Sequence, residues 1–460
     1  MADRRGLNPL KRCFLIILAF LIVASPRPAL AAWGDGLFPD ALNHWAAEPL
    51  NFLGALDIVR GYPDGTCRPD QPLTAVEAVV LLMRATEYTA ARTTNLKIDI
   101  PAGAVWAKND LALAVQNGIV ANEELQPSVL LQPAPRYLVW QFLARSLKIP
   151  LDRETALDFS DAAQVPAGAV PAASTLVRLG ILRGQPDGTL RPLDTITRAE
   201  LLALLARMIE DGWLNPVPAR RLEGWVQAVR QDAGRSRPLT GSTGISGSRT
   251  GSPLPGRYII TLSTPGGGSK DYPLATNAGV FNLTLPTPFA LENLHVVAAL
   301  NRRNELAFIK AYEPRQPGQL TANTGTVEKV IQGRNLQLVL RDLDHELHTY
   351  DANWATTVPG GLLSLKQGQW VKVALNETAA WNIEPLEVKK ATGTIEAIEG
   401  RKLYLDKFDK NLGNVFLDWE RARLSGKDGT EYTGSGLKIG SKVEITCLDW
   451  DKVLEIKVQD

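Results

Sequence analysis

Two arginines stand where the sequence predicts the first turn of a helix. Arg198 follows Thr197 in the segment 197–200, Thr-Arg-Ala-Glu, and Arg136 follows Pro135 at the start of another apolar run. A guanidinium at a helix start offers a planar fork of donors beside the positive end of the helix dipole, which suits a carboxylate-bearing ligand. The alternative for Arg198 is structural, because this arginine can also be an exposed helix-start residue or the partner of a nearby glutamate.

Aromatic and acidic residues in the same region have two interpretations each. The indole ring of Trp45 can stack on the face of a sugar, but burial in a helical core is the alternative for both Trp45 and Trp106. Asp64 and Asp187 lie in Pro-Asp-Gly-Thr segments, where turn geometry explains them better than ligand binding does.

The stretch 342–348, Asp-Leu-Asp-His-Glu-Leu-His, has the composition of a metal-binding segment. Side chains alternate along a strand, so His345 and His348 should point to opposite faces, and the HExxH spacing of a helical zinc site is lacking. We therefore predict a polar hairpin edge and no metal site. The glycines at 266–268 are predicted to form a hairpin loop, and no Gly-x-Ser-x-Gly with a supporting triad occurs. No catalytic residue and no cofactor are predicted.

Composition and charge exclude several classes of protein. The chain has 460 residues, of which 45% are hydrophobic and 22% charged, as in ordinary globular proteins. At roughly 150 residues per domain, this length predicts about three domains. The 50 basic and 49 acidic residues leave a net charge of +1, which gives no support to a nucleic-acid partner. Only 3 cysteines and 4 histidines occur, which excludes a disulfide scaffold and leaves little material for a zinc or histidine-based catalytic centre.

The first 31 residues have the pattern of a secretory signal peptide. Basic residues come first, an apolar run covers residues 13–24, and an A-x-A pattern ends at Ala31. This run is too short to span roughly 30 Å of hydrocarbon at about 1.5 Å per residue, so we predict cleavage after Ala31. The alternative is an uncleaved membrane anchor. With cleavage, we expect an extracellular protein that has no further contact with the membrane.

Two segments repeat one another without gaps. Residues 61–77 and 184–200 share their spacing, including the Pro-Asp-Gly-Thr turn, and a weaker middle copy runs over 106–147. Thr74 and Thr197 each precede an apolar run and have a glutamate three residues later, which predicts a capping box at each helix start. The pattern predicts packed helical repeats at about 35–88, 100–148 and 156–212.

After the repeats, the apolar pattern becomes alternating. Residues 214–232 are predicted to form one more helix, because Leu222, Trp225, Val226 and Val229 follow a helical stripe. Residues 233–256 are rich in Gly, Ser, Thr and Pro and are predicted to be a flexible linker. Short alternating runs then predict all-β units, each a small barrel or sandwich. The predicted units cover 255–316, 321–389 and 390–460.

The N-terminal repeats resemble S-layer homology domains. The resemblance covers about residues 35–212 and implies a multidomain protein. Its N-terminal part would be an all-α domain of three repeats forming a pseudo-threefold helical spindle, followed by all-β small barrel or sandwich repeats. The last two β units loosely resemble small β-barrel repeats found beside such domains. The motifs that carry the resemblance are Phe38-Pro39-Asp40 with His44-Trp45-Ala46, the turn Gly61-Tyr62-Pro63-Asp64-Gly65-Thr66, Phe159-Ser160-Asp161 and Ile196-Thr197-Arg198-Ala199-Glu200.

The resemblance also implies a ligand and a binding site. S-layer homology domains bind secondary cell-wall polysaccharide that carries anionic, often pyruvylated, sugars, and the arginine of the Thr-Arg-Ala-Glu motif contacts it. That position is Arg198 in the third repeat, Arg136 in the second and Ala75 in the first, so one or two working grooves are expected. The expected polysaccharide-binding residues are Arg198, Arg136, Glu200, Trp45, Tyr62, Gly61 and Gly184.

These observations predict a non-enzymatic surface protein held at the cell wall or surface layer through its repeats. Its expected partners are the anionic wall polysaccharide and other surface-layer proteins, with the β units displayed as an S-layer, envelope-scaffold or adhesion module. The alternative is an anchored extracellular enzyme with an active site in the β half.

Overall fold

The computed structural model of the 460-residue chain describes most residues after position 35. The predicted signal peptide (1–31) and the predicted linker (233–256) lie outside the described residues. Within the described part, none of the helices is both long enough and apolar enough to cross a membrane. The described residues are 36–86, 98–152, 156–232, 257–264, 268–283, 287–312, 321–333, 335–399, 402–406, 416–418, 422–431, 437–448 and 452–459.

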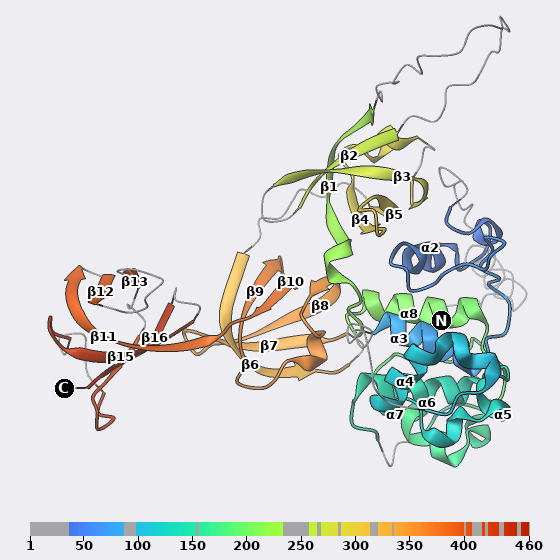
Figure 1. Cartoon of the computed structure of the whole chain (residues 1–460), viewed down its shortest axis with the longest axis horizontal. Helices are drawn as coiled ribbons and strands as arrows, with labels where there is room; N and C mark the ends of the chain where they lie inside the picture. Colours follow the sequence, from blue (N-terminus) through green and yellow to red (C-terminus); the bar gives the residue numbers. More distant parts are fainter. Residues whose placement is uncertain are drawn as a thin grey trace, which may run out of the picture. The chain divides into compact units, whose positions relative to one another are not determined.

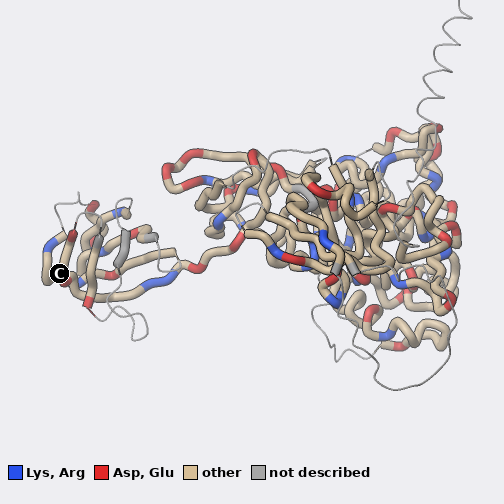
Figure 2. Tube along the Cα trace, turned by 90° about the horizontal axis from the view of Figure 1, so that it is seen from above, with Lys and Arg blue, Asp and Glu red and all other residues tan. Residues whose placement is uncertain are grey.

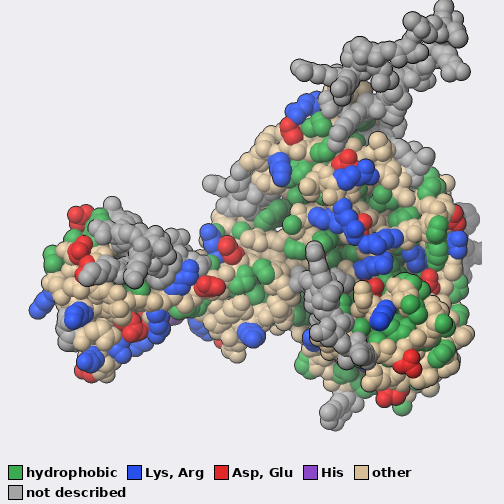
Figure 3. Space-filling model, viewed as in Figure 1, with side chains coloured by type: hydrophobic (Ala, Val, Ile, Leu, Met, Phe, Trp, Pro, Cys, Tyr) green, Lys and Arg blue, Asp and Glu red, His purple; other side chains and the backbone are tan. Residues whose placement is uncertain are grey.

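Charge is distributed along the whole chain. Acidic and basic residues are interleaved along the Cα trace (Figure 2). On the face drawn in Figure 3, Lys and Arg side chains gather in patches with acidic side chains beside them. This distribution agrees with the net charge of +1.

The chain divides into two compact units. The first takes in the chain up to Pro69 together with Leu222–Thr264 and Gly268–Arg315. The second takes in Asp70–Arg221 and Gln316–Asp460, with the short segment Pro265–Gly267.

In the first unit, helix α2 (Ala47–Ala55) packs against a closed β-barrel (Figure 1). The ring centroids of Phe52 in α2 and Phe308 in the barrel lie 5.3 Å apart, and Glu48 pairs with Lys310 at 2.5 Å. This contact therefore combines apolar burial with an ion pair. The barrel strands are, in spatial order, β1 (Arg221–Asp232), β2 (Arg257–Ser263), β3 (Ser269–Phe281), β5 (Leu306–Tyr312) and β4 (His295–Leu300), and the short helices are η1 (Pro39–Ala41) and η8 (Pro288–Leu291).

The helix predicted over 214–232 is wrong, because Arg221–Asp232 forms strand β1. This strand pairs with β2, and its register shifts between Val226 and Ala228. A bulge of this kind inserts one residue and changes which face the following side chains take. As a result Val226 and Val229 are both buried, at 1% and 5% exposed, although they are three residues apart. The bulged strand therefore reproduces the spacing of a helical stripe.

The pairing of β1 with β2 also bears on the predicted division of the chain into a helical half and a β half. The sequence predicts a tether between a helical half and a β half. In the structure, β1, which ends at Asp232, and β2, which begins at Arg257, are neighbouring strands of one barrel.

The second unit contains the remaining helices. Their largest fully buried side chains include Leu81 and Met83 of α3 and Phe142 and Leu143 of α6, which form an apolar core. The helices are α3 (Ala75–Ala85), α4 (Lys108–Gln116), α5 (Pro127–Leu130), α6 (Arg136–Leu147), α7 (Val170–Arg178) and α8 (Arg198–Glu210), with the short turns η3 (Ala102–Ala107), η4 (Asn122–Leu125), η5 (Ala162–Gln164), η6 (Ala167–Ala169) and η7 (Pro218–Arg220).

The second unit also holds two sheets. One is a closed barrel in the order β10-β8-β7-β6-β9, and the other is a six-stranded sheet in the order β13-β12-β11-β15-β16-β14. The six-stranded sheet has its own apolar core, which includes Leu403, Leu405, Val443 and Ile445. The elements are β6 (Thr321–Ile331), β7 (Gln337–Asp342), β8 (Leu347–Thr357), η9 (Leu362–Ser364), β9 (Trp370–Asn376), β10 (Ala379–Pro385), β11 (Val388–Glu399), β12 (Lys402–Asp406), β13 (Phe416–Asp418), β14 (Arg423–Ser425), β15 (Lys442–Leu448) and β16 (Lys452–Val458).

The predicted order of fold classes, helical first and β-rich afterwards, agrees with these elements. The one exception inside the helical part is strand β1, where the sequence predicts a helix.

Candidate functional site

Three short segments, each directly before a helix of the second unit, hydrogen-bond to one another in a cycle. The backbone N–H of Leu73 donates to the carbonyl of Ile196 at 3.0 Å, Ile196 donates to Ala134 at 3.0 Å, and Ala134 donates to Leu73 at 2.7 Å. These segments lead into α3, α8 and α6, respectively. The cycle therefore fixes the starts of three helices from three repeats beside one another.

The first residue of each of these helices is held in the same way. Ala75 donates its N–H to Gln132, Arg136 to Asp194 and Arg198 to Gln71, at 2.9–3.1 Å. Thus the structure places the three positions that the resemblance singles out, Ala75, Arg136 and Arg198, in equivalent surroundings.

The predicted capping boxes are confirmed at α3 and α8. Thr74 accepts a bond from the N–H of Glu77, and the Glu77 carboxylate accepts from the N–H of Thr74. Thr197 and Glu200 make the same pair of bonds at α8. Helix α6 follows Pro135, which makes no side-chain cap.

The two predicted ligand arginines differ in their exposure. Arg198 is buried, with 7% of its surface exposed. The side chain of Arg136 is 15% exposed, and its Nη1 lies 2.7 Å from Oε1 of Glu200, whose side chain is 31% exposed. The structure therefore brings together Arg136 of the second repeat and Glu200 of the third. A salt bridge with a glutamate, which is the alternative considered for Arg198, is made by Arg136.

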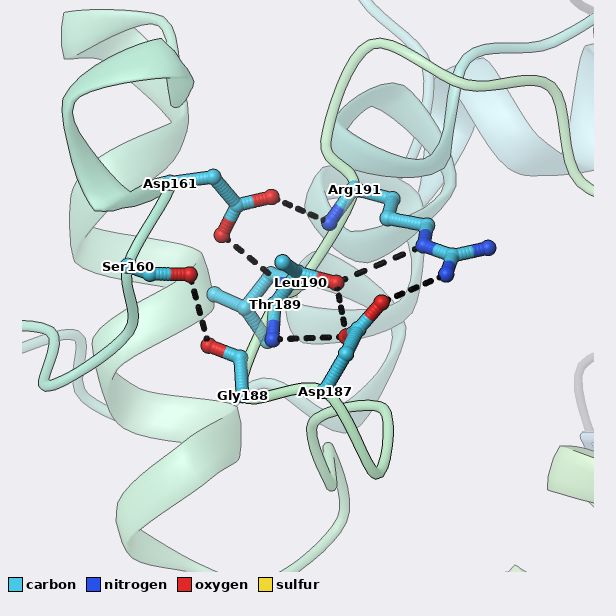
Figure 4. Close-up of polar contacts among 7 residues, drawn as sticks. All are labelled: Ser160, Asp161, Asp187, Gly188, Thr189, Leu190 and Arg191. Atoms are coloured by element: carbon cyan, nitrogen blue, oxygen red, sulfur yellow. Dashed lines mark hydrogen bonds and ion pairs between the residues drawn. The ribbon is translucent and has the colours of Figure 1, made fainter.

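A second constellation ties the beginning of the third repeat to its turn (Figure 4). The carboxylate of Asp161 accepts the backbone N–H of Leu190 at 2.9 Å with one oxygen and that of Arg191 at 2.7 Å with the other. Ser160 donates its N–H and its hydroxyl to the carbonyl of Gly188 at 3.1 and 3.2 Å. We call Asp161, Asp187, Thr189 and Arg191 the carboxylate clamp.

Within the clamp, Asp187 bonds to both of its partners in the turn. Its Oδ1 accepts from the N–H and the hydroxyl of Thr189 at 3.1 and 2.6 Å, and its Oδ2 lies 2.6 Å from Nη2 of Arg191 (Figure 4). These bonds, first from the Thr189 hydroxyl and then from Arg191, lower the pKa of Asp187 from 3.8 to about 2. Asp187 raises the pKa of Arg191 in turn. Asp187 and Arg191 are therefore both charged at neutral pH.

The first repeat has the same clamp in the first unit. Asp40 accepts from the N–H groups of Cys67 and Arg68 at 2.8 and 2.7 Å, and Asp64 lies 2.9 Å from Nη2 of Arg68. The Thr66 hydroxyl donates to Asp64 at 2.6 Å, and hydrogen bonds from Thr66 hold the pKa of Asp64 well below its usual range. The turn geometry predicted for Asp64 and Asp187 agrees with these bonds.

Of the expected binding residues, Tyr62 belongs to this first clamp. The Cζ atom of Arg68 lies 4.0 Å from the centroid of the Tyr62 ring, which is cation–π geometry. The third repeat has Gln185 where the first has Tyr62, so the stacking is specific to the first repeat.

Gly61 and Gly184 have a packing role in the structure. A Cβ on Gly184 would lie 2.3 Å from Cε1 of Phe159, and a Cβ on Gly61 would lie 3.0 Å from the Thr66 carbonyl and 3.3 Å from the Phe38 ring. Glycine is required because the aromatic ring that opens each repeat packs directly against this backbone.

The alternative that Trp45 and Trp106 are buried in a helical core is wrong. They are 64% and 58% exposed. They hold equivalent repeat positions, since each is followed by an alanine that is fully buried, Ala46 and Ala107. The small alanine fills the core at this point, and the ring of the preceding residue stays on the surface.

Sequence reasoning missed Asp40, Asp161, Arg68 and Arg191 as parts of the site. The signals were present, because a Phe-x-Asp segment opens both repeats and an arginine follows each turn. Arg68 and Arg191 both take left-handed backbone angles, with φ of 53° and 52°. That conformation turns their N–H groups toward the aspartates, and residue pattern alone does not predict it.

The stretch 342–348 forms the turn between β7 and β8, so the predicted polar hairpin edge is confirmed. Within the residues that the structure describes, Asp342, Glu346 and His348 are the one group with the spacing of metal ligands. They lie in the second barrel, outside the helical repeats.

Comparison with known proteins identifies the helical part. Residues 37–74 and 158–202 match the S-layer homology domain family. The helical part of the chain therefore contains S-layer homology domain segments. The match covers segments of the first and third repeats, in which the clamp is duplicated.

Its relatives include proteins of cell surfaces. Cell surface glycoprotein 1 of Acetivibrio thermocellus is 30% identical over 174 residues, which is 35% of this chain and 7% of the relative. The Cellulosome-anchoring protein of the same organism is 27% identical over 164 residues, 34% of this chain and 36% of the relative. An Amylopullulanase of Thermoanaerobacterium thermosulfurigenes is 23% identical over 184 residues, 38% of this chain and 10% of the relative. The chain thus spans well under half the length of these relatives.

Proposed function

We propose that the helical repeats hold this protein non-covalently at the cell wall by binding an anionic, for example pyruvylated, secondary cell-wall polysaccharide. The observation that carries the proposal is the pair of exposed tryptophans, Trp45 and Trp106, at equivalent positions in two repeats. Large aromatic side chains that stay exposed at a repeated position are typical of recognition surfaces, and an indole stacks well on a sugar ring.

The acidic part of the ligand is assigned to the Arg136 region. Arg136 lies at the positive end of α6, and among the described residues its guanidinium is paired with Glu200 through Nη1 alone. A guanidinium has further N–H donors, so a ligand carboxylate can share it with Glu200. Arg198 is buried and is therefore less available for direct contact with the ligand.

The proposal is tested by retention on purified cell-wall sacculi with and without their attached polymer. We expect the protein to sediment with complete sacculi and to stay in solution with stripped sacculi. Trp106→Ala should weaken retention, because it removes an exposed stacking surface, whereas Val105→Ala, its 57% exposed neighbour, should not. Equal retention on stripped sacculi would reject the polysaccharide as the ligand.

The arginines provide a second comparison. Arg136→Ala should weaken retention more than Ala75→Gly, because the first repeat has no guanidinium at this position. A charged hydrogen bond lost in this way is worth about 1.5–3 kcal/mol, roughly ten- to a hundredfold in affinity. Equal retention of the two variants would reject the assignment of the acidic group to Arg136.

We further propose that the β part is a non-enzymatic display module, which acts as an S-layer, envelope-scaffold or adhesion element. The relatives named as enzymes, an amylopullulanase and an exoglucanase, are aligned over 184 and 179 residues. Those alignments fall in the S-layer homology part, so they do not support an enzymatic activity for the β part of this chain. Hydrolysis of wall or storage glycans by the purified chain would contradict this part of the proposal.

A further inference from the structure

The hairpin between β7 and β8 carries three metal-ligating side chains. Asp342 ends β7, His348 is the second residue of β8, and Glu346 lies in the turn between them. One ligand atom from each of these residues lies within 4.8 Å of the other two. They come from both strands and from the turn, so the fold of the hairpin itself gathers them.

Asp342 and His348 already face one another. Nε2 of His348 lies 2.7 Å from Oδ2 of Asp342, and the two side chains are 33% and 13% exposed. Ligand atoms that share one tetrahedral zinc ion lie roughly 3.3–3.6 Å apart, because each is about 2.0–2.2 Å from the metal. The two ligand atoms of Asp342 and His348 therefore have to separate by roughly a further 0.6–0.9 Å to admit an ion.

The surroundings orient both ligands. The other oxygen of Asp342 accepts the backbone N–H groups of Asp344 and Glu346, at 2.9 Å each. The ring of His348 lies parallel to that of Tyr350, with an interplanar angle of 2° and centroids 6.0 Å apart. Orientation of this kind is what outer partners provide in metal sites.

Charge in the hairpin favours a cation. Asp342, Asp344 and Glu346 bring three carboxylates into one turn. The neighbouring cation, Arg341, has its Nε 3.1 Å from Glu328 and donates Nη1 to the His345 carbonyl at 3.2 Å. Arg341 is therefore paired with Glu328 and the backbone and leaves the net charge of the turn negative.

We propose that Asp342, Glu346 and His348 bind a divalent first-row transition metal, with Zn²⁺ as the probe. One imidazole nitrogen and two carboxylate oxygens form a borderline donor set that suits zinc, whereas Ca²⁺ and Mg²⁺ prefer oxygen ligands only. Three protein ligands leave coordination positions for water. Such an ion would join the two strands at the end of the second barrel.

His345 is not part of this site and supplies a matched control. It lies at the tip of the turn with a φ of 66°, and its N–H donates to the Asp342 carbonyl at 3.1 Å. The sequence-based expectation places both histidines on one strand, whereas His345 lies in the turn between β7 and β8, and the ligand group includes His348 alone.

The experiment is calorimetric titration of Zn²⁺ into the full chain after treatment with a chelator and its removal. We expect about one equivalent to bind, and His348→Ala and Glu346→Gln each to weaken binding by about tenfold or more. The His345→Ala variant should bind Zn²⁺ with the affinity of the unaltered chain. Titration of Ca²⁺ into the unaltered chain should give no comparable heat. Glu346 is exposed, so its variant tests the site even if His348→Ala disturbs the hairpin.

Three results would overturn the proposal. The first is that the unaltered chain does not bind Zn²⁺. The second is that His345→Ala and His348→Ala lose equal amounts of Zn²⁺ affinity, and the third is that Ca²⁺ binds as tightly as Zn²⁺. A thermal-unfolding scan with and without Zn²⁺ gives an independent readout, because a ligand that binds the folded state raises the melting temperature by mass action.

Discussion

At the scale of single residues, the carboxylate clamp shows how a turn is fixed by charge rather than by burial. Asp161 accepts two backbone N–H groups from a segment 29 and 30 residues away. Asp187 then pairs with Arg191 inside that segment. Because the same bonds recur around Asp40 and Asp64, the arrangement belongs to the repeat and not to one place in the chain.

The clamp should make the third-repeat turn sensitive to acid. The pKa of Asp187 is lowered to about 2 in the folded state, so ionised Asp187 stabilises the turn above its ordinary pKa of 3.8. This contribution should be lost as the pH falls from about 4 to about 2. Amide hydrogen exchange of a peptide covering residues 186–192 should therefore lose protection in that interval.

Asp187→Asn provides the comparison for this prediction. The amide cannot ionise, so protection of the same peptide should already be reduced at neutral pH and should change less between about pH 4 and pH 2. If the variant and the unaltered chain show the same profile, Asp187 does not control the turn.

The contact between Gly184 and Phe159 predicts a steric cost. In Gly184→Ala, the new methyl group would lie 2.3 Å from Cε1 of Phe159, so the ring or the backbone must move. Overpacking of this kind costs about 1–3 kcal/mol of folding free energy. Gly168→Ala is the control, because its Cβ would meet a neighbour only at 3.9 Å. Thermal unfolding should separate the two variants, and equal melting temperatures would contradict the packing role.

At the scale of elements, sequence patterns predicted the helix starts better than they predicted β1. The boxes at Thr74 and Thr197 depend on residues three positions apart, so local spacing is enough to find them. Strand β1 contains a bulge that buries Val226 and Val229 together, and this imitates helical spacing. The exposure of Trp45 also could not be predicted from the local sequence pattern, because it depends on which neighbouring side chain fills the core.

The place of β1 in the first barrel predicts how the chain behaves when it is cut between β1 and β2. A specific protease site is inserted between residues 240 and 250 and cut in the native protein. The two fragments should stay together in size-exclusion chromatography, because β1 is hydrogen-bonded to β2 and Val226 to residues 293 and 294. A tether between separate halves would instead release two particles.

At the scale of the whole molecule, the helical and β regions were predictable from period and composition, but their grouping was not. Pattern placed all β units after the linker, whereas the first compact unit combines the start of the chain with the first barrel. The contact between Phe52 and Phe308 joins residues that are far apart in the sequence, and local sequence patterns do not predict such contacts. The predicted binding residues Arg136 and Glu200 do meet, while the polysaccharide that they are predicted to bind stays a prediction.

The location of the anchor predicts which part of the chain is dispensable for retention. The six-stranded sheet closes its own apolar core from residues between Ile395 and Ile456, so a chain that stops after Glu387 removes that core as a whole. We expect this truncated chain to sediment with complete sacculi to the same extent as the full protein. With stripped sacculi it should stay in solution, as the full protein should. The physical reason is that the exposed tryptophans and Arg136 all lie before residue 213. A truncated chain that folds, judged by an unchanged melting transition of the remainder, but no longer sediments would place part of the wall-binding surface on the last sheet.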